Sequence, residues 1–163
     1  MSQRAFQSLP DFGFTPLQVQ TLQQRLRAPQ FLYISGPAGG GKTKAAMLLA
    51  WTFFQAYRRP FRIDGQDMTT TQIRQAAIEQ NAGILFHDLA SSHDYMKAGY
   101  CTACHMTTVG IAFDGPSSAT HAHASLVARL PDLTARDNVI VIGVERDEDS
   151  TEIERYKIDL HLG

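Results

Sequence analysis

A run of small residues that ends in a lysine and a threonine is the part of this sequence best suited to chemistry. Residues 36–43 read GPAGGGKT and match the pattern G-x-x-x-x-G-K-[ST] at every fixed position. The glycines let the backbone bend tightly and bring its N–H groups against phosphate oxygens without interference from Cβ atoms. A helix that starts here adds unpaired N–H groups and the positive end of its dipole. The motif therefore predicts a site for ATP with Mg²⁺.

Lys42 and Thr43 have the most specific roles in this prediction. We expect Lys42 to stabilise charge on the β and γ phosphates, as a catalytic residue, and Thr43 to place its hydroxyl on Mg²⁺. The alternative is a chance glycine-rich turn. However, residues 31–34 predict a buried strand and residues 45–54 an apolar helix, which is the context that the motif requires. The predicted nucleotide-binding residues are the loop and the helix start, namely Gly36, Pro37, Ala38, Gly39, Gly40, Gly41, Lys42, Thr43 and Lys44.

Hydrolysis needs acidic residues that the phosphate loop does not supply, because Mg²⁺ requires a carboxylate and the attacking water must be oriented. Asp88 ends an apolar run, and we predict that it is catalytic and holds Mg²⁺ from a strand that neighbours the phosphate-loop strand; the alternative is an aspartate that caps the next turn. Asp64, with Asp67 beside it, is the catalytic candidate for orienting water, although a solvated Asp-Gly turn fits equally well. Asp114 could sense the γ phosphate, but the Gly-Pro that follows favours a turn residue.

Strands and helices alternate around the loop. Residues 1–14 are predicted to be a loose lead-in, and Thr15 should cap a helix that ends near Arg27. The helix after the loop has apolar residues all around its axis, so we expect it to be buried on most sides. The remaining predicted elements are strands at 61–63, 83–88, 108–113, 139–144 and 154–162, and helices at 69–80, 91–104 and 117–130. This alternation predicts an α/β domain with a largely parallel sheet, helices on both faces and an antiparallel C-terminal edge.

The composition bounds the function further. The chain has 163 residues, 44% hydrophobic and 19% charged, which fits one domain over 1–163 with a hydrophobic core. A net charge of −1 gives no indication of nucleic-acid binding, although Arg58, Arg59 and Arg62 form a local basic group. The chain contains no apolar run of about 20 residues, so we expect no membrane span, and we expect a cytoplasmic protein with reduced thiols. Cys101 and Cys104 stand in a haem-attachment pattern, but too few ligands accompany them for zinc, and packing at a helix end explains them better.

Taken together, these segments resemble the catalytic domain of the motor ATPases of type II secretion and type IV pilus systems, a group that also includes type IV secretion and conjugation ATPases. The similarity extends over about residues 12–133. It involves the entry into the loop (14–18, 28–29, 31–37), the segment into the Walker B acid (73–76, 83–88) and two later segments (109–114, 124–130). The resemblance implies a RecA-like P-loop fold, ATP hydrolysis, assembly as a homo-oligomeric ring, and association with the inner face of the membrane through a partner.

The chain also departs from that family. His87 and Asp88 stand where the family has Gly-Glu, and the histidine of its His box is replaced by Phe113 or Asp114. An arginine is absent near Ala90, the acidic box is shortened, and we find no counterpart of the arginine-donating N-terminal domain. Candidates for an arginine donated by a neighbouring subunit are Arg129, Arg136, Arg146 and Arg155. The departures predict ATP binding with weak hydrolysis in isolation. The alternatives are a non-catalytic regulator that binds a full-length secretion or conjugation motor ATPase, and a small-molecule kinase.

Overall fold

A computed structural model of the chain describes residues 8–28, 30–54, 61–62, 72, 75, 79, 84–89, 107–112, 114–129, 138–147 and 155–162. The described helices are α1 (Leu9–Phe12), α2 (Pro16–Arg25), α3 (Lys42–Phe54) and α6 (Ala119–Arg129). The described strands are β1 (Phe31–Ser35), β2 (Phe61–Arg62), β3 (Ile84–Leu89), β4 (Thr107–Ala112), β5 (Val139–Arg146) and β6 (Tyr156–Leu162).

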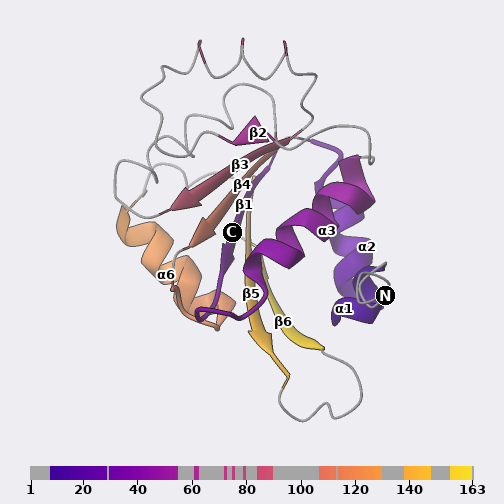
Figure 1. Cartoon of the computed structure of the whole chain (residues 1–163), viewed down its shortest axis with the longest axis vertical. Coiled ribbons are helices and arrows are strands. Elements are labelled where there is room, and N and C mark those ends of the chain that lie inside the picture. The colour runs from indigo at the N-terminus through magenta and orange to yellow at the C-terminus, as the bar shows by residue number, and fades with distance from the viewer. Residues whose placement is uncertain are drawn as a thin grey trace.

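The strands form one sheet in the order β2-β3-β4-β1-β5-β6. All neighbouring pairs from β2 to β5 are parallel, and β6 alone runs antiparallel to its neighbour β5. Strand β1, which leads into the phosphate loop, therefore lies between β4 and β5 near the middle of the sheet (Figure 1). This arrangement confirms the predicted, mostly parallel α/β sheet with an antiparallel C-terminal edge.

Helices cover both faces of the sheet, with α6 on one side and α1, α2 and α3 on the other (Figure 1). The side chains of β1 alternate between the two faces, as the pleat of a strand requires. Leu32 and Ile34 are buried in the cluster that includes residues of α1, α2 and α3, whereas Phe31 and Tyr33 are buried with residues of α6. A strand buried on both faces is typical of a parallel sheet.

The second helix confirms its predicted start. The Thr15 side chain accepts a hydrogen bond from the Gln18 N–H, and the Gln18 side chain accepts one from the Thr15 N–H. This reciprocal capping box satisfies two backbone donors that no carbonyl within the helix can reach. The helix ends at Arg25, and Leu22 is fully buried on its inner face.

The sequence prediction for the lead-in is wrong. Within the segment expected to be loose, residues 9–12 form α1, whose residues Leu9 and Phe12 belong to the core. The helix α3 is buried on most sides as expected, at Ala45, Ala46, Leu48, Leu49 and Ala50, but Met47 is 47% and Trp51 62% exposed. Helices α1 and α2 pack beside α3 without enclosing it, so one stripe of its apolar residues faces outward. Among the described helices, none has the length and apolar character needed to span a bilayer.

Candidate functional site

The phosphate loop connects the buried strand β1 to the first turn of α3. The helix begins at Lys42, and the Gly41 carbonyl accepts its first hydrogen bond, from the Ala45 N–H at 2.9 Å. The leading N–H groups of a helix have no acceptor within the helix, so they are available to an anion together with the positive dipole end. Inside the loop, the Gly40 N–H donates to the Pro37 carbonyl at 3.0 Å. The predicted strand, loop and helix therefore occur in the order that phosphate binding requires.

Two glycines of the loop stand where no side chain fits. A Cβ atom on Gly36 would overlap the carbonyl oxygen of Val144, near the end of β5. Gly41 has a φ of +90°, and a Cβ atom there would lie 2.5 Å from the Tyr156 ring. The loop is thus pressed against the β5–β6 hairpin at both of its ends. This close backbone approach explains why glycines are needed at these two positions.

Lys42 folds back over the loop that precedes it. Its Nζ donates to the Gly36 carbonyl at 2.7 Å and to the Pro37 carbonyl at 3.3 Å. Burial lowers the pKa of Lys42 below its ordinary value of 10.5, and the carboxylate of Asp114 opposes that shift. The ammonium group is therefore held at the mouth of the loop, partly withdrawn from water, where a phosphate would replace the carbonyl oxygens as acceptor.

Asp114 lies in a turn beyond the end of β4, as the sequence predicts. It is exposed and has a φ of +54°, an uncommon conformation for a residue other than glycine. Since β4 is hydrogen-bonded to β1, the turn that follows β4 is next to the phosphate loop. The sequence interpretation offered a place near the γ phosphate only as the less favoured alternative for Asp114, because its proximity to Lys42 depends on the strand order.

The residues predicted to hold Mg²⁺ come from α3 and β3. Thr43 is exposed in the first turn of α3. Asp88 is paired with Ile111 of β4, which in turn is paired with Ile34 of β1. The strand of Asp88 is therefore two positions from β1, about 10 Å away. The expectation that it is the direct neighbour of β1 is wrong, because β4 lies between them. Asp64 and Asp67 lie outside the described residues, so the water-orienting role stays a prediction.

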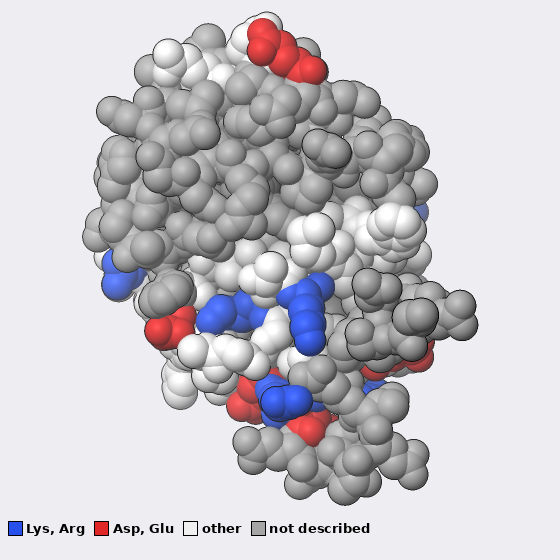
Figure 2. Space-filling model, viewed as in Figure 1, with Lys and Arg blue, Asp and Glu red and all other residues white. Residues whose placement is uncertain are grey.

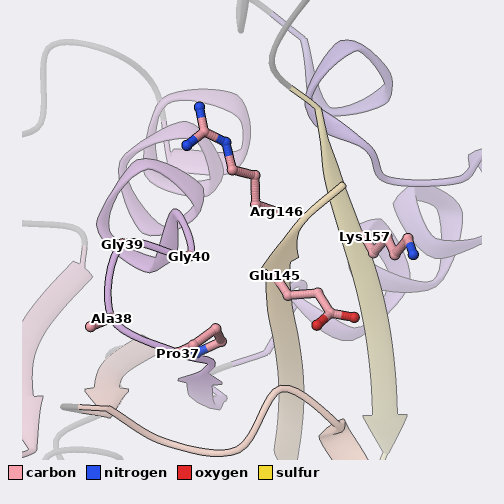
Figure 3. A pocket seen from close by; sticks show the side chains of 7 residues that line it. All are labelled: Pro37, Ala38, Gly39, Gly40, Glu145, Arg146 and Lys157. Carbon is pink, nitrogen blue, oxygen red and sulfur yellow. The ribbon is translucent and has the colours of Figure 1, made fainter. Parts of the chain in front are cut away.

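A cavity of about 660 Å³ opens between the loop and the β5–β6 hairpin. Its walls are residues of the loop on one side and of the hairpin on the other (Figure 3): Pro37, Ala38, Gly39, Gly40, Glu145, Arg146 and Lys157. A second cavity of about 350 Å³ adjoins the first turn of α3 and is bounded by Tyr156. Basic side chains gather in the middle of this face of the molecule (Figure 2), which suits an anionic ligand.

The hairpin residues of this site were missed by sequence reasoning, except that Arg146 was one of several candidate arginines. Tyr156 stacks on Phe12 with ring centroids 4.4 Å apart and presses on Gly41. The available signal was the β5 pattern ending in charged residues, but their position beside the loop depends on long-range pairing. The segments that contain Cys101, Cys104 and Ala90 lie outside the described residues. In the described part of the chain, no group of three or more His, Cys, Asp or Glu residues is arranged to hold a metal ion.

Comparison with known proteins identifies the fold. No protein-family model matches the chain, and no curated protein matches it. Among solved structures it is similar to the ATPase DotB of Legionella pneumophila, with a TM-score of 0.67 and 10% sequence identity over 95% of this chain. It is also similar to the pilus retraction motor PilT with bound ADP (TM-score 0.62, 10% identity, 94% of this chain). A third match is DotB of Yersinia pseudotuberculosis (TM-score 0.58, 9% identity, 93% of this chain).

The chain spans about half the length of these structures, 50%, 52% and 47% in the same order. At such low identity the similarity concerns the fold alone. It is the RecA-like P-loop fold that these ATPases and the pilus retraction motor share. The resemblance inferred from the sequence is therefore confirmed for the fold.

Proposed function

We propose that the protein binds ATP with Mg²⁺ at the phosphate loop and hydrolyses it weakly in isolation. The observation that carries the proposal is the glycine-rich loop of residues 36–41, which packs against β5 and β6. Lys42 begins the helix that follows, and its ammonium group donates to the loop carbonyls. This loop suits a polyphosphate because backbone N–H groups, a helix dipole and a lysine converge on it. The fold similarity to the ADP-bound motor PilT supports the choice of an adenine nucleotide.

Each residue then has a defined task. The backbone from Gly36 to Lys44 cradles the phosphates, and Lys42 neutralises charge on the β and γ phosphates. Thr43 and Asp88 would hold Mg²⁺, which supplies further positive charge to the transferred phosphoryl group. Asp64 is proposed to orient the attacking water. Phosphoryl transfer depends mainly on positioning and electrostatic stabilisation, so these groups account for the activity without a covalent step.

The direct test is Lys42→Ala, with ATP and ADP affinity measured by calorimetry in the presence of Mg²⁺. We expect loss of most of the affinity, because a charge-assisted contact to the phosphates is removed. Arg27→Ala serves as the control, since it removes one positive charge at an exposed position just after α2. If the wild-type protein gives no binding signal, or if Lys42→Ala binds ATP as the wild type does, the proposal is wrong.

Phosphate release by the pure protein separates hydrolysis from binding alone. Slow, Mg²⁺-dependent release that disappears in Lys42→Ala and Asp88→Asn is the expected result. Intact ATP binding with no release, under all conditions including self-association, would favour a non-catalytic regulator of a larger motor. An assay with a full-length secretion or conjugation motor would then show whether the chain inhibits that motor. Assembly into a ring of identical subunits is a further proposal, tested by light scattering with and without ATP.

A further inference from the structure

Arg146 is the last residue of β5 and lies on the face of the sheet that carries α3. Its register partner across the antiparallel pair is Tyr156. Val144, two residues earlier, is buried in the same cluster as α3, and residues two apart in a strand share a face. Figure 3 shows the Arg146 side chain extending toward the helix that follows Gly39 and Gly40. Glu145 and Lys157, which are register partners of each other, extend to the other side.

The backbone that carries Arg146 is fixed relative to the phosphate loop. Tyr156, its register partner, is only 4% exposed, is stacked on Phe12, and presses against Gly41 immediately before Lys42. On the other strand, Gly36 at the start of the loop meets the carbonyl of Val144. Loop and hairpin therefore touch at both ends of the loop, and Arg146 follows directly after these contacts. The backbone at Arg146 is therefore positioned by packing within one chain.

The chemistry of the cavity wall indicates what Arg146 contacts. The cavity between loop and hairpin is lined by Arg146 together with four residues of the loop. A guanidinium offers donors in a fork that matches two phosphate oxygens, and it remains charged at all working pH values. We propose that Arg146 contacts the nucleotide bound by its own chain, with its guanidinium donating to phosphate oxygens at the mouth of the loop. This inference rests on the proposed function and adds a phosphate-binding residue supplied within the chain, where the sequence allowed a neighbouring subunit as the source.

The first experiment compares two ligands across four proteins. Affinities for Mg²⁺-ATP and for inorganic tripolyphosphate are measured for the wild type, Arg146→Ala, Arg146→Lys and Arg27→Ala. Arg27 is an exposed arginine just after α2 that has no role in the proposed site, so it controls for the loss of one positive charge. We expect Arg146→Ala to weaken the binding of both ligands about tenfold, the size of a charged hydrogen bond. Arg146→Lys should retain part of that affinity, and Arg27→Ala should change it less than about threefold.

Unchanged affinity in Arg146→Ala would overturn the inference. Weaker ATP binding with unchanged tripolyphosphate binding would overturn it as well, because the contact would then be to the nucleoside. The far-ultraviolet spectrum and unfolding midpoint establish that each variant is folded. A wild-type protein that does not bind ATP refutes the proposed function itself. If the wild type binds ATP and Arg146→Ala binds it with the same affinity, this inference alone is refuted.

A mixing experiment tests whether the arginine acts within the chain. Lys42→Ala retains Arg146 but has a disabled loop, whereas Arg146→Ala retains Lys42. If Arg146 acts on its own chain, an excess of Lys42→Ala leaves the weakened ATP affinity of Arg146→Ala unchanged. Restoration of affinity on mixing would mean that a neighbouring subunit donates the arginine, and the inference would be wrong.

Discussion

The two faces of the sheet are both well packed, but only one of them carries the candidate site. On the α6 face, Phe31 and Tyr33 pack with Leu126 and with valines of β5. On the α3 face, Leu32 and Ile34 pack with residues of α1, α2 and α3, and α3 itself begins at the phosphate loop. Strand β1 contributes side chains to both faces. Both faces therefore contribute to stability, whereas the geometry of the anion site depends on the α3 face, where the phosphate loop leads into the helix.

Matched cavity mutations give the largest expected effect. Leu49 on α3 and Leu126 on α6 are both fully buried. Replacing either with alanine removes the same atoms and should lower the free energy of unfolding by about 2–5 kcal/mol. The two variants should differ in ligand binding. Leu49→Ala lets α3 shift and should weaken ADP binding, whereas folded Leu126→Ala should bind ADP as the wild type does.

Urea unfolding with and without Mg²⁺-ADP measures both quantities. A ligand that binds only the folded state adds stability that depends on its concentration relative to Kd. The increment that ADP adds should be preserved in Leu126→Ala and reduced in Leu49→Ala. Equal loss of the increment in the two variants would show that the α6 face also shapes the site, and the comparison between the faces would fail.

A pair of glycines in the loop sharpens the comparison within the α3 face. Gly39 and Gly41 both have positive φ, of +71° and +90°. A Cβ atom on Gly39 meets nothing within 4 Å, whereas one on Gly41 would press into the Tyr156 ring. Backbone strain of about 1–3 kcal/mol is common to both alanine variants. Gly41→Ala should therefore weaken ADP binding well beyond Gly39→Ala, since the loop must also separate from β6.

Calorimetry of the two variants decides this prediction. The reference is the wild-type affinity for ADP, and the unfolding midpoint shows whether each protein is folded at the temperature used. If Gly39→Ala loses as much affinity as Gly41→Ala, backbone strain is sufficient and the contact with Tyr156 has no separate role.

Local sequence signals were enough to predict much of the α3 face. The capping box at Thr15, the motif over residues 36–43 and the start of α3 each depend on residues close together in the chain, and each local element forms as expected. The strong β pattern of residues 139–144 likewise identified β5. Such features follow from backbone chemistry and side-chain periodicity over a few residues.

Several features that depend on long-range pairing were not predicted, although the parallel sheet and its antiparallel edge were. Helix α1 is a short segment whose Phe12 is ordered by Tyr156, more than a hundred residues away along the chain. Because β4 lies between β1 and β3, Asp88 is one strand farther from the loop than expected. The same strand order places Asp114, which follows β4, next to Lys42. Strand order and antiparallel register are not encoded in any local pattern, so the acidic and hairpin sides of the site required the structure.

The smallest expected effect concerns the α6 face, where two histidines meet. The rings of His123 on α6 and His161 on β6 have centroids 4.3 Å apart. The Nε2 atom of His123 is enclosed and has no hydrogen-bond partner within the described part of the chain. Burial, followed by the influence of His161, lowers the pKa of His123 below its ordinary value of 6.5. Asp159, on the same side of β6, accepts from the Ala119 N–H at 2.8 Å.

The sign of the resulting pH dependence follows from that pKa. Below about pH 6.5 the unfolded chain binds a proton at His123 before the folded protein does, so the free energy of unfolding falls. The stability that the neutral His123 contributes is fully present above pH 6.5 and is lost as the pH drops through the lower, folded-state pKa.

His123→Gln should make the free energy of unfolding depend less on pH between pH 7.5 and about 5, as measured by urea unfolding. His121→Gln, at an exposed position of the same helix, should leave the curve as steep as in the wild type. An unchanged slope in His123→Gln would mean that the contact between α6 and β6 tolerates the charged imidazole. The α6 face would then respond to burial of apolar side chains alone.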